Sequence, residues 1–360
     1  MKKLSIVISL FLLGAGILLG GCTATVVDDT TTTTSTTVTT TTATTTTTSA
    51  ASTTSTTTTT STTTTTVWST EVSGTTEDLL GSFAYGDDIT DYSIWAVGTG
   101  GKIIHSSYDD PGNWGPLASG TTETLNDYGY FWNSGVTRTF ITGGNGTIFK
   151  GTSSWSWTPT SSGTTSSLNG VSTASTLEIW VVGANGLILA TTNSGISWET
   201  QASGTIDNLN KVQMISTSYG YVVGDNGTIA RTNNGSSWAT VTSGTPEDLR
   251  ALHFPNAQLD IGWAVGDNGT ILNIMDWNSG SWQAQTSGTT VDLYGVKFIN
   301  TFEGFVVGAG GTVLHTSDSG AHWAMQGSGT GNALYDLSIV GTSEVWAVGA
   351  AGTAIHHSIP

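Results

Sequence analysis

Short apolar runs separated by glycine-rich turns repeat along the chain from residue 67 to the end. One full copy spans residues 221–245, YVVGDNGTIARTNNGSSWATVTSGT. It contains an apolar run, a Gly-Asp-Asn-Gly turn, a second run, an Asn-rich turn that ends at Trp238, and a third run closed by Ser-Gly-Thr. Short runs bounded by turn residues are typical of β-strands, so the pattern predicts an all-β fold.

Three sequence anchors recur in all seven copies. Ser-Gly-Thr begins at residues 73, 119, 162, 203, 243, 287 and 328. A glycine stands at 98, 143, 183, 224, 266, 308 and 349, and another glycine follows each of them three residues later. An aromatic residue precedes the first glycine by three positions, as Trp95, Phe140, Trp180, Tyr221, Trp263, Phe305 and Trp346. The period of 40 to 46 residues is typical of propellers and solenoids.

Each copy is predicted to contain four strands, A to D. In the fifth copy we expect strand A at 249–254, strand B at 262–265, strand C at 270–274, and strand D from Trp282 to the next Ser-Gly-Thr. The Gly-Asp-Asn-Gly segment at 266–269 predicts a tight B–C hairpin turn, because Asn and Gly accept positive φ. Four antiparallel strands in each copy are typical of a propeller blade.

The two ends of the repeat region distinguish a closed propeller from an open solenoid. The seventh copy stops after strand C, whereas residues 67–72 form an additional strand D before the first Ser-Gly-Thr. A solenoid offers no reason for this offset and needs capping repeats. We therefore predict a seven-bladed β-propeller of four-stranded antiparallel blades at 67–360, with the N-terminal strand closing the last blade. The seven strand-D tryptophans are Trp68, Trp114, Trp157, Trp198, Trp238, Trp282 and Trp323.

The N-terminal segment is predicted to be an export signal. Two lysines precede an apolar run at 4–19, and the sequence Leu-Gly-Gly-Cys at 19–22 resembles the bacterial lipoprotein signal, in which the cysteine is lipidated. Cys22 is the only cysteine, so no intramolecular disulfide can form. We expect residues 1–21 to be a lipoprotein signal peptide and Cys22 to carry the lipid. An ordinary signal peptide with an incidental cysteine is the alternative.

A Thr-rich segment follows the cysteine. Residues 30–66 are almost entirely Thr, without charged or aromatic residues. Such a segment cannot bury enough apolar surface to offset the entropy of ordering it, so we predict a disordered tether at 22–66. As a coil it would reach roughly 35 Å. O-glycosylation and an unmodified spacer are both open alternatives. Together these features predict a lipid-anchored protein of the bacterial cell envelope, at the outer membrane or cell surface.

The turn between strands C and D resembles a known repeat. The segments TTNSGISW at 191–198 and TSDSGAHW at 316–323 resemble the Asp-box (BNR) motif, Ser/Thr-x-Asp/Asn-x-Gly-x-Ser/Thr-Trp, although the second departs from it at its histidine. A weaker third copy has Asn233 and Gly235, with Arg231 in the hydroxyl position. Asp boxes occur in sialidases and in many non-enzymatic propellers, where they imply turns that stabilise the fold.

The repeat as a whole resembles the photosystem II stability and assembly factor family. The Val-Gly-x-x-Gly-Thr-Ile core and the Ser-Gly-Thr link carry this likeness, which covers residues 67–360. The resemblance implies a seven-bladed propeller and a role in protein assembly. Photosynthetic members use basic surface residues for their partners, and this chain is poor in them, so a role in photosynthesis is not expected.

Acidic residues far outnumber basic ones. The net charge is −17, and without the two lysines of the signal, seven basic residues face 26 acidic ones. This balance argues against binding nucleic acid. Strands D and B run towards the same face, so the acids of the D–A and B–C loops should form a rim around the channel. The rim could bind a basic partner or divalent cations, or it could reflect turn chemistry in solvent. These acids are Glu77, Asp78, Glu123, Asp207, Glu247, Asp248, Asp292, Asp225 and Asp267.

One position near the end of strand C holds a potentially cationic side chain in five copies. We expect this position to lie close to the strand-D tryptophans, where such groups can stack on an indole. Equivalent positions in neighbouring blades lie too far apart to share a metal, so no metal site is predicted. The residues are His105, Lys150, Ala190, Arg231, Asn273, His315 and His356.

Enzymatic chemistry is not expected. Sialidases require three converging arginines, but Arg138, Arg231 and Arg250 occupy three different positions: before strand B, late in strand C and early in strand A. The sequence contains no nucleophile–base constellation, metal-ligand spacing or phosphate loop. We therefore predict a non-enzymatic binding or assembly module without a cofactor. A carbohydrate-binding or sialidase-like propeller is the alternative.

The predicted binding face lies at the start of the A strands. One position there holds Leu80, Asn126, Asn169, Asn210, Arg250, Tyr294 and Tyr335, which should ring the channel mouth. The neighbouring D–A loops vary on a constant scaffold, and such loops commonly bind partners. The asparagines could instead satisfy strand ends. The partner is an unidentified protein, which a basic surface would suit, or a glycan. The candidate residues are Arg250, Tyr294, Tyr335, Asn210, Asn169, Asn126, Glu247, Asp248, Asp225 and Asp267.

Overall fold

The computed structural model divides the chain into two compact units, Met1–Thr65 and Thr66–Pro360. The structure describes residues 39–47, 55–63, 68–88, 91–107, 109–133, 135–151, 156–255, 261–275 and 280–359. The predicted signal peptide and Cys22 lie outside these residues. Within them, no helix is both long and apolar enough to cross a membrane.

The first unit contains a pair of strands in the Thr-rich segment. Strands β1 (Thr39–Thr47) and β2 (Ser55–Thr63) are antiparallel, with Thr39 opposite Thr63. The sequence predicts disorder here, whereas the structure pairs these segments. The physical reason is that β-branched threonine favours an extended backbone, and ladder hydrogen bonds do not require apolar side chains. The role of the segment as a tether stays a prediction.

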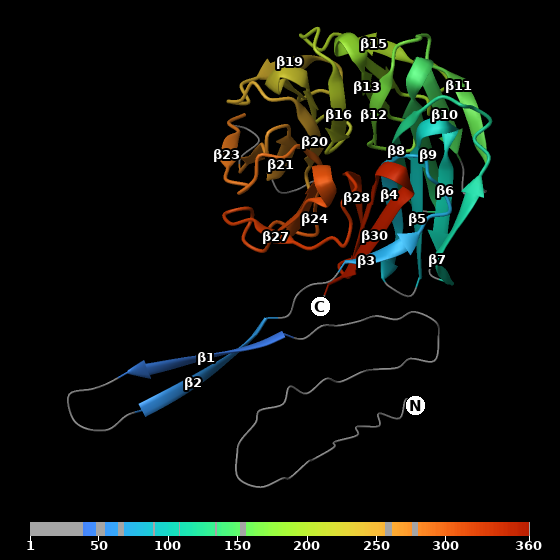
Figure 1. Cartoon of the computed structure of the whole chain (residues 1–360). Coiled ribbons are helices and arrows are strands. Elements are labelled where there is room, and N and C mark those ends of the chain that lie inside the picture. The colour runs from blue at the N-terminus through green and yellow to red at the C-terminus, as the bar shows by residue number, and fades with distance from the viewer. Residues whose placement is uncertain are drawn as a thin grey trace. The chain divides into compact units, whose positions relative to one another are not determined.

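The second unit is a ring of seven four-stranded antiparallel sheets (Figure 1). Blades 1 to 3 comprise β4 (Leu79–Asp88), β5 (Asp91–Gly98), β6 (Ile103–Ser107) and β7 (Asp110–Leu117); β8 (Leu125–Asn133), β9 (Val136–Gly143), β10 (Thr147–Gly151) and β11 (Trp157–Ser161); β12 (Leu168–Thr173), β13 (Ile179–Gly183), β14 (Ile188–Thr191) and β15 (Glu199–Gln201). Blades 4 and 5 comprise β16 (Leu209–Met214), β17 (Gly220–Gly224), β18 (Ile229–Thr232) and β19 (Trp238–Val241); β20 (Leu249–His253), β21 (Gly262–Gly266), β22 (Ile271–Ile274) and β23 (Gln283–Gln285). Blades 6 and 7 comprise β24 (Leu293–Phe298), β25 (Gly304–Gly308), β26 (Val313–Thr316) and β27 (Ala324–Gln326); β28 (Leu334–Val340), β29 (Glu344–Gly349), β30 (Thr353–Ser358) and β3 (Ser69–Val72).

Strand β3 closes the ring, as the sequence predicts. It pairs antiparallel with β30, placing Ser69 opposite His356. The preceding Trp68 is buried, packs against Phe305 of blade 6, and donates a hydrogen bond from Nε1 to Gln326 Oε1 at 2.9 Å. The N-terminal strand therefore completes blade 7, and the first and last blades meet like any other neighbours.

The core is divided into seven buried clusters, each between two adjacent blades. The repeated strand-B aromatic of one blade packs against the strand-D tryptophan of the next blade. Edge-to-face geometry and large buried area make such pairs strong packing contacts. The edge-to-face pairs are Trp68–Phe305, Trp114–Trp346, Trp157–Trp95, Trp198–Phe140 and Trp282–Tyr221, with ring centroids 5.7 to 6.2 Å apart.

The B–C turn explains why glycine and Ser-Gly-Thr recur together. In blade 4, Asn226 and Gly227 both adopt positive φ, at 54° and 69°. A Cβ on Gly227 would overlap the carbonyl oxygen of Thr245, the last residue of the Ser-Gly-Thr link. Ser243 Oγ of the same link accepts the Thr245 N–H at 3.4 Å. The link thus packs onto the turn, and the two anchors specify one contact. Six of these turns form short 3-10 segments: η1 (Thr99–Gly101), η2 (Gly144–Gly146), η3 (Ala184–Gly186), η4 (Asp225–Gly227), η5 (Ala309–Gly311) and η6 (Ala350–Gly352).

The two full Asp-box segments form closed C–D turns. Thr191 Oγ1 accepts the N–H of Gly195 at 3.1 Å, and Thr316 Oγ1 accepts the N–H of Gly320 at 2.9 Å. Strands C and D are the outer strands of each blade, so these turns stabilise the periphery of the ring and lie away from the channel.

The third Asp-box copy has a different register from the one predicted. The N–H of Gly235 donates to Thr232 Oγ1 at 3.0 Å, and Asn234 Oδ1 accepts two backbone N–H groups of the turn. Thr232 and Asn234 therefore hold the positions that the sequence interpretation gave to Arg231 and Asn233. The spacing from the hydroxyl residue to the glycine is therefore one residue shorter in this turn than in the two full copies. The sequence interpretation counted positions back from the tryptophan, so it did not detect the difference.

The position near the end of strand C lies against a different ring from the one expected. It is directly opposite the strand-B aromatic in the B–C ladder, so the two side chains share one face of the sheet. The partner is the strand-B ring and not the strand-D indole that was predicted; the rings are stacked at His356 and tilted at His105 and His315. The ring pairs are Trp95–His105, Phe305–His315 and Trp346–His356, with centroids 4.4, 4.6 and 4.7 Å apart.

Candidate functional site

The A strands surround the channel and provide its lining. Each is the innermost strand of its sheet and therefore a sheet edge, with backbone groups that no neighbouring strand pairs. Figure 1 shows these strands (β4, β8, β12, β16, β20, β24 and β28) around the axis of the ring. The second, third and fifth residues of the A strands form the layers considered below.

The asparagines of the predicted mouth ring connect neighbouring blades. The Nδ2 atoms of Asn126, Asn169 and Asn210 donate to the carbonyl oxygens that begin strand A of the next blade, at 2.9 to 3.0 Å. These acceptors belong to Leu168, Leu209 and Leu249. The asparagines therefore satisfy strand ends, which is the alternative that the sequence left open.

Arg250 lies among the acids of the rim. Its guanidinium forms a bidentate pair with Asp267, with Nε–Oδ1 at 2.8 Å and Nη2–Oδ2 at 2.6 Å. Nη2 also reaches Asp248 Oδ2 at 3.1 Å, and Nη1 lies 3.9 Å from Asp225. Hydrogen bonding to Asp267 raises the pKa of Arg250, against the opposing effect of its burial. The structure thus brings together four of the predicted residues, and the local charge is negative.

Tyr294 and Tyr335 continue this group around the mouth. Their ring centroids are 5.5 Å apart, both side chains are partly exposed, and burial raises the pKa of each phenol. They belong to blades 6 and 7, next to Arg250 on blade 5. We call Arg250, Tyr294 and Tyr335 the mouth arc; it presents one guanidinium and two phenol rings on three consecutive blades.

Much of the acidic rim has a structural role. Three aspartates, each placed immediately before an A strand, accept the backbone N–H of a B–C turn in the preceding blade. Asp207 instead accepts side-chain hydrogen bonds from Thr228, Asn226 and Thr205, which lower its pKa. Glu247 lies on the same type of loop, and its carboxylate forms no ion pair within the described residues. The three capping bonds are Asp78–Ala351, Asp248–Asn226 and Asp292–Asn268, at 2.8 to 3.0 Å.

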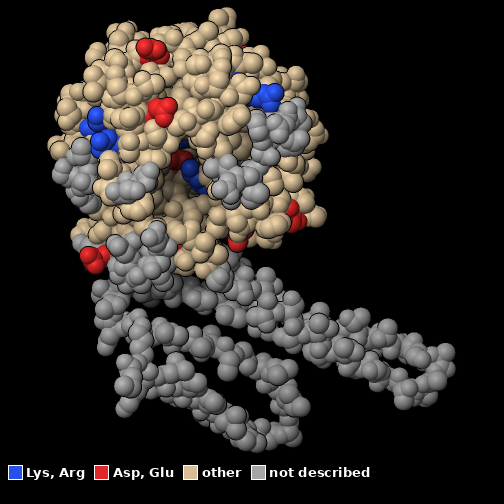
Figure 2. Space-filling model, turned by 180° about the vertical axis from the view of Figure 1, so that it is seen from behind, with Lys and Arg blue, Asp and Glu red and all other residues tan. Residues whose placement is uncertain are grey.

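A charged cluster inside the channel was missed by the sequence interpretation. Asp127 and Asp336, at the third position of strand A, accept the N–H groups of Val171 and Ser82 in the next blade at 2.9 and 2.7 Å. Lys211 holds the same position two blades beyond Asp127 and pairs with it at 2.7 Å. Figure 2 shows basic and acidic atoms within the central hollow of one face. The sequence does show polar residues at the third position of several A strands. It does not show that they meet in the channel, because that depends on closure of the ring.

The fifth-position layer follows the same rule. Ser172, Gln213 and His253 accept N–H groups of the next blade's A strand, at 2.9, 2.9 and 3.0 Å. Burial, with contributions from Lys297 and Lys211, lowers the pKa of His253 well below its ordinary value. The amides along these strand edges have no neighbouring strand and require acceptors, so this lining is partly a structural necessity.

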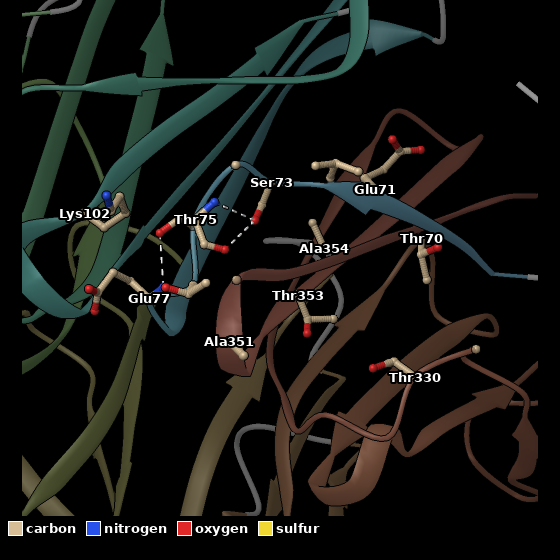
Figure 3. A pocket seen from close by; sticks show the side chains of 15 residues that line it. Thr70, Glu71, Ser73, Thr75, Glu77, Lys102, Thr330, Ala351, Thr353 and Ala354 are labelled. Carbon is tan, nitrogen blue, oxygen red and sulfur yellow. Dashed lines mark hydrogen bonds between the residues drawn. The ribbon is translucent and has the colours of Figure 1, made fainter. Parts of the chain in front are cut away.

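An open groove lies at the closure seam (Figure 3). It has a volume of about 690 Å³ and is lined by β3, the first Ser-Gly-Thr link and the turn at Gly352. Figure 3 shows Ser73 and Thr75 bonded to each other within the link. Two further grooves use the same repeat position, against the links at 119–121 and 162–164. Because the groove recurs at the same position of the repeat, we attribute it to the geometry of the turn. We therefore assign it no binding function.

Aromatic side chains are exposed on the inner hairpins of blades 1 and 2. Phe83 stacks on Tyr130 with centroids 4.3 Å apart, and Tyr85 lies 5.4 Å from Tyr130. Tyr85 and Trp132 are 46% and 54% exposed. Burial raises the pKa of Tyr130 to about 12, and the neighbouring Tyr85 adds to this. We call Tyr85, Tyr130 and Trp132 the aromatic platform; the sequence interpretation did not single it out.

The three arginines and the metal-ligand residue types do not gather at one point. Arg138 lies within β9, and not before strand B as expected, because that strand begins at Val136. Arg231 lies in β18 and Arg250 in β20, so the arginines belong to blades 2, 4 and 5. Within the described ranges, no group of three or more His, Cys, Asp or Glu residues could hold a metal ion.

These features define a seven-bladed β-propeller with Asp-box turns, a mouth arc and a charged channel. The sequence profile of PSII_BNR, described as photosynthesis system II assembly factor YCF48, matches residues 230–327, which span blades 5 and 6 and the outer strands of blade 4. No curated protein matches the chain in sequence.

Solved propellers have the same architecture. The chain is 16% identical to YCF48 bound to D1 peptide, with a TM-score of 0.66, covering 81% of this chain and 95% of that one. YCF48 from Cyanidioschyzon merolae is 18% identical, with a TM-score of 0.66 and coverages of 81% and 98%. Streptogramin B lyase is 12% identical, with a TM-score of 0.66 and coverages of 81% and 97%. These matches confirm the resemblance to YCF48-like propellers, and at these identities what they share with the chain is the fold.

Proposed function

We propose that this chain is a non-enzymatic binding or assembly module that captures a protein partner on its D–A and B–C loop face. The observation that carries the proposal is the mouth arc, Arg250, Tyr294 and Tyr335, on a closed ring. Arginine and tyrosine contribute disproportionately to binding energy at protein interfaces, especially when a rigid scaffold positions them. The likeness to YCF48 supports a protein partner, because one of the similar structures is YCF48 bound to D1 peptide.

The charge around the mouth arc favours a basic partner. Asp225, Asp248 and Asp267 surround the single cation Arg250, so the surface is negative even with that arginine in place. Charge complementarity accelerates encounter and disfavours partners of the wrong sign. A partner would therefore present Lys or Arg to the carboxylates and apolar or amide groups to the two tyrosine rings.

The test compares the two faces of the propeller. The variant Arg250→Ala, Tyr294→Ala, Tyr335→Ala should lose at least tenfold in affinity for partners recovered with the unaltered protein. A matched variant of the opposite side, Tyr85→Ala with Trp132→Ala, should retain it. Circular dichroism checks that both variants are folded. Equal affinity of the mouth-arc variant, or loss confined to the opposite-side variant, would reject this face as the binding site.

We also propose that the module is anchored in the bacterial envelope through a lipid on Cys22. This proposal rests on the lipoprotein-like sequence at residues 19–22. The Cys22→Ala variant should leave the membrane fraction and the detergent phase, because the lipid is the attachment proposed. A control substitution in the Thr-rich segment, Thr58→Ala, should not change the partition. Continued membrane association of Cys22→Ala would show that another element anchors the chain.

The aromatic platform favours glycan binding as a second candidate function. Tyr130 and Trp132 are two residues apart on β8, so they share one face of the strand, and Tyr85 contributes a third ring. Exposed rings of this kind can stack on the apolar faces of sugars. Glycan-array binding that is lost in Trp132→Ala and retained in the mouth-arc variant would support this function, and absence of binding to any glycan would exclude it for the array tested.

A further inference from the structure

Lys297 is a channel cation that contacts no carboxylate of the described residues. It holds the fifth position of strand A in blade 6, where Ser172, Gln213 and His253 stand in other blades. Lys211 pairs with Asp127, whereas Lys297 forms no ion pair among the residues that the structure describes. Burial lowers the pKa of Lys297, and Lys211 adds to this against the opposing charges of Asp336 and Asp127. The ammonium group therefore has unused capacity to donate.

His253 holds the equivalent position on the A strand of the neighbouring blade 5. Its Nδ1 accepts the backbone N–H of Phe298, the residue next to Lys297, at 3.0 Å. That bond assigns the neutral ring the tautomer that carries hydrogen on Nε2. Within the described part of the chain, no partner is recorded for Nε2. One imidazole N–H and one ammonium group thus come from the same position of adjacent A strands.

Side chains of the channel charges are open to solvent. Lys211, His253 and Lys297 are all partly exposed. Lys211 pairs with Asp127 of blade 2, and its side chain is still 22% exposed. The hollow in Figure 2 contains both basic and acidic atoms, so charged groups within it are open to at least one face.

The surrounding charges limit what can bind. Lys211, Lys297, Asp127 and Asp336 sum to zero at neutral pH when His253 is neutral. An anion therefore adds negative charge to a neutral group that already contains two carboxylates. A monoanion adds half as much as a dianion, so a monoanion is the more favourable ligand for Lys297 and His253. A carboxylate has two acceptor oxygens, which match one ammonium donor and one imidazole donor.

We propose that the channel contains a carboxylate-binding subsite formed by Lys297 Nζ and His253 Nε2–H, with Lys211 as the neighbouring cation. The ligand is a monoanionic carboxylate, presented by a small organic acid or by a side chain or chain end of a bound polypeptide. The subsite is separate from the mouth arc and does not depend on the proposed protein-binding function.

The test follows His253 by NMR during addition of sodium acetate at constant ionic strength, with sodium chloride as the reference titration. A bound anion favours the imidazolium form, so the pKa of His253 should rise saturably with acetate. The Lys297→Met variant should bind acetate at least tenfold more weakly. Lys102→Met removes a lysine outside the channel and should bind as the unaltered protein does.

If Lys297→Met does not fold, a second variant still tests the subsite. His253→Gln retains an acceptor for the Phe298 N–H, as Gln213 does for Phe254, and should lose most of the acetate-dependent increase in Tm. Lack of a saturable response above the chloride reference, or an unchanged response in both variants, would overturn the subsite. Tighter binding of inorganic phosphate than of acetate would overturn the choice of a carboxylate. N-acetylated amino acids and peptides that end in a free carboxylate would then distinguish a small acid from a chain end.

Discussion

At the scale of single residues, charge and stacking occur together at His356. Its ring stacks on Trp346 with centroids 4.7 Å apart, and its nitrogens lie 3.0 Å from Glu71 and 3.3 Å from Glu344. Burial opposes its charge, but hydrogen bonds to Glu344 and Glu71 outweigh this and raise the pKa of His356 to about 9. Since Glu71 lies on β3 and His356 on β30, this ion pair joins the two strands at which the ring closes.

The His356 contacts predict that stability depends on pH. The folded-state pKa lies above the ordinary value of 6.5, so the stabilisation is complete below pH 6.5 and is lost as pH rises through about 9. The free energy of unfolding of the unaltered protein should exceed that of His356→Asn by ~1–3 kcal/mol at pH 6, and the difference should fall towards zero at pH 10. Chemical denaturation at several pH values measures this.

The exposed pair of His322 with Asp318 provides the matched control. His322→Asn should change stability little at any pH, because exposed ion pairs contribute little. A His356→Asn effect of constant size between pH 6 and pH 10 would mean that the side chain stabilises by packing and not by charge.

At the scale of elements, the same contacts between neighbouring blades recur around the ring, with different side chains at equivalent positions. The strand-D tryptophan packs on the strand-B aromatic of the preceding blade, and strand β3 supplies this contact for blade 7 through Trp68 and Phe305. The A strands need acceptors for their edge amides, which explains the polar side chains of the channel. Element boundaries follow the local turn chemistry, so they could be predicted closely.

Removal of residues 67–72 should destabilise the propeller by several kcal/mol. The deletion removes the ladder between β3 and β30 together with the buried Trp68, and truncating a buried tryptophan alone typically costs ~3–5 kcal/mol. Thermal and urea unfolding of the deletion variant and of Trp68→Ala would separate the indole contribution from that of the strand. An unchanged melting temperature in the deletion variant would show that ring closure does not depend on this strand.

At the scale of the whole molecule, the ring decides which residues converge. Arg138, Arg231 and Arg250 lie on blades 2, 4 and 5, and Arg250 is already paired with Asp267 and Asp248. This arrangement does not provide the arginine cluster that a sialidase uses for its substrate carboxylate. Lys211 and Asp127, in contrast, are 84 residues apart in sequence, lie on blades 4 and 2, and come within 2.7 Å.

A fluorogenic sialoside should therefore not be cleaved above the rate without protein. Purified protein and Arg250→Ala would be assayed in parallel, with an active sialidase as the positive control for the substrate. Turnover that copurifies with the protein and disappears in Arg250→Ala would contradict the non-enzymatic assignment.

The sequence by itself determined the fold, because each repeat contains the residues that define its own turns and its packing against the neighbouring blade. The glycines at 224 and 227, the link at 243–245 and the aromatic Tyr221 act within a blade or between neighbours, so their spacing is visible in one dimension. The additional strand with Trp68 likewise predicted closure from a simple count of tryptophans. Local turn geometry and nearest-neighbour packing are short-range properties, and a repeated sequence displays them seven times.

Only the tertiary structure decided which side chains meet across blades. The ring assigned Asp248 to a turn of the preceding blade and placed Asp127 against the backbone N–H of Val171 in the next blade. It also placed His253 against the backbone of Phe298, the residue after Lys297, and left Lys297 without a carboxylate partner among the described residues. Such contacts depend on blade twist, register and closure, which set the distances between residues of different blades. A linear pattern contains the residue types for the channel, but the distances between them arise only when the seventh blade meets the first.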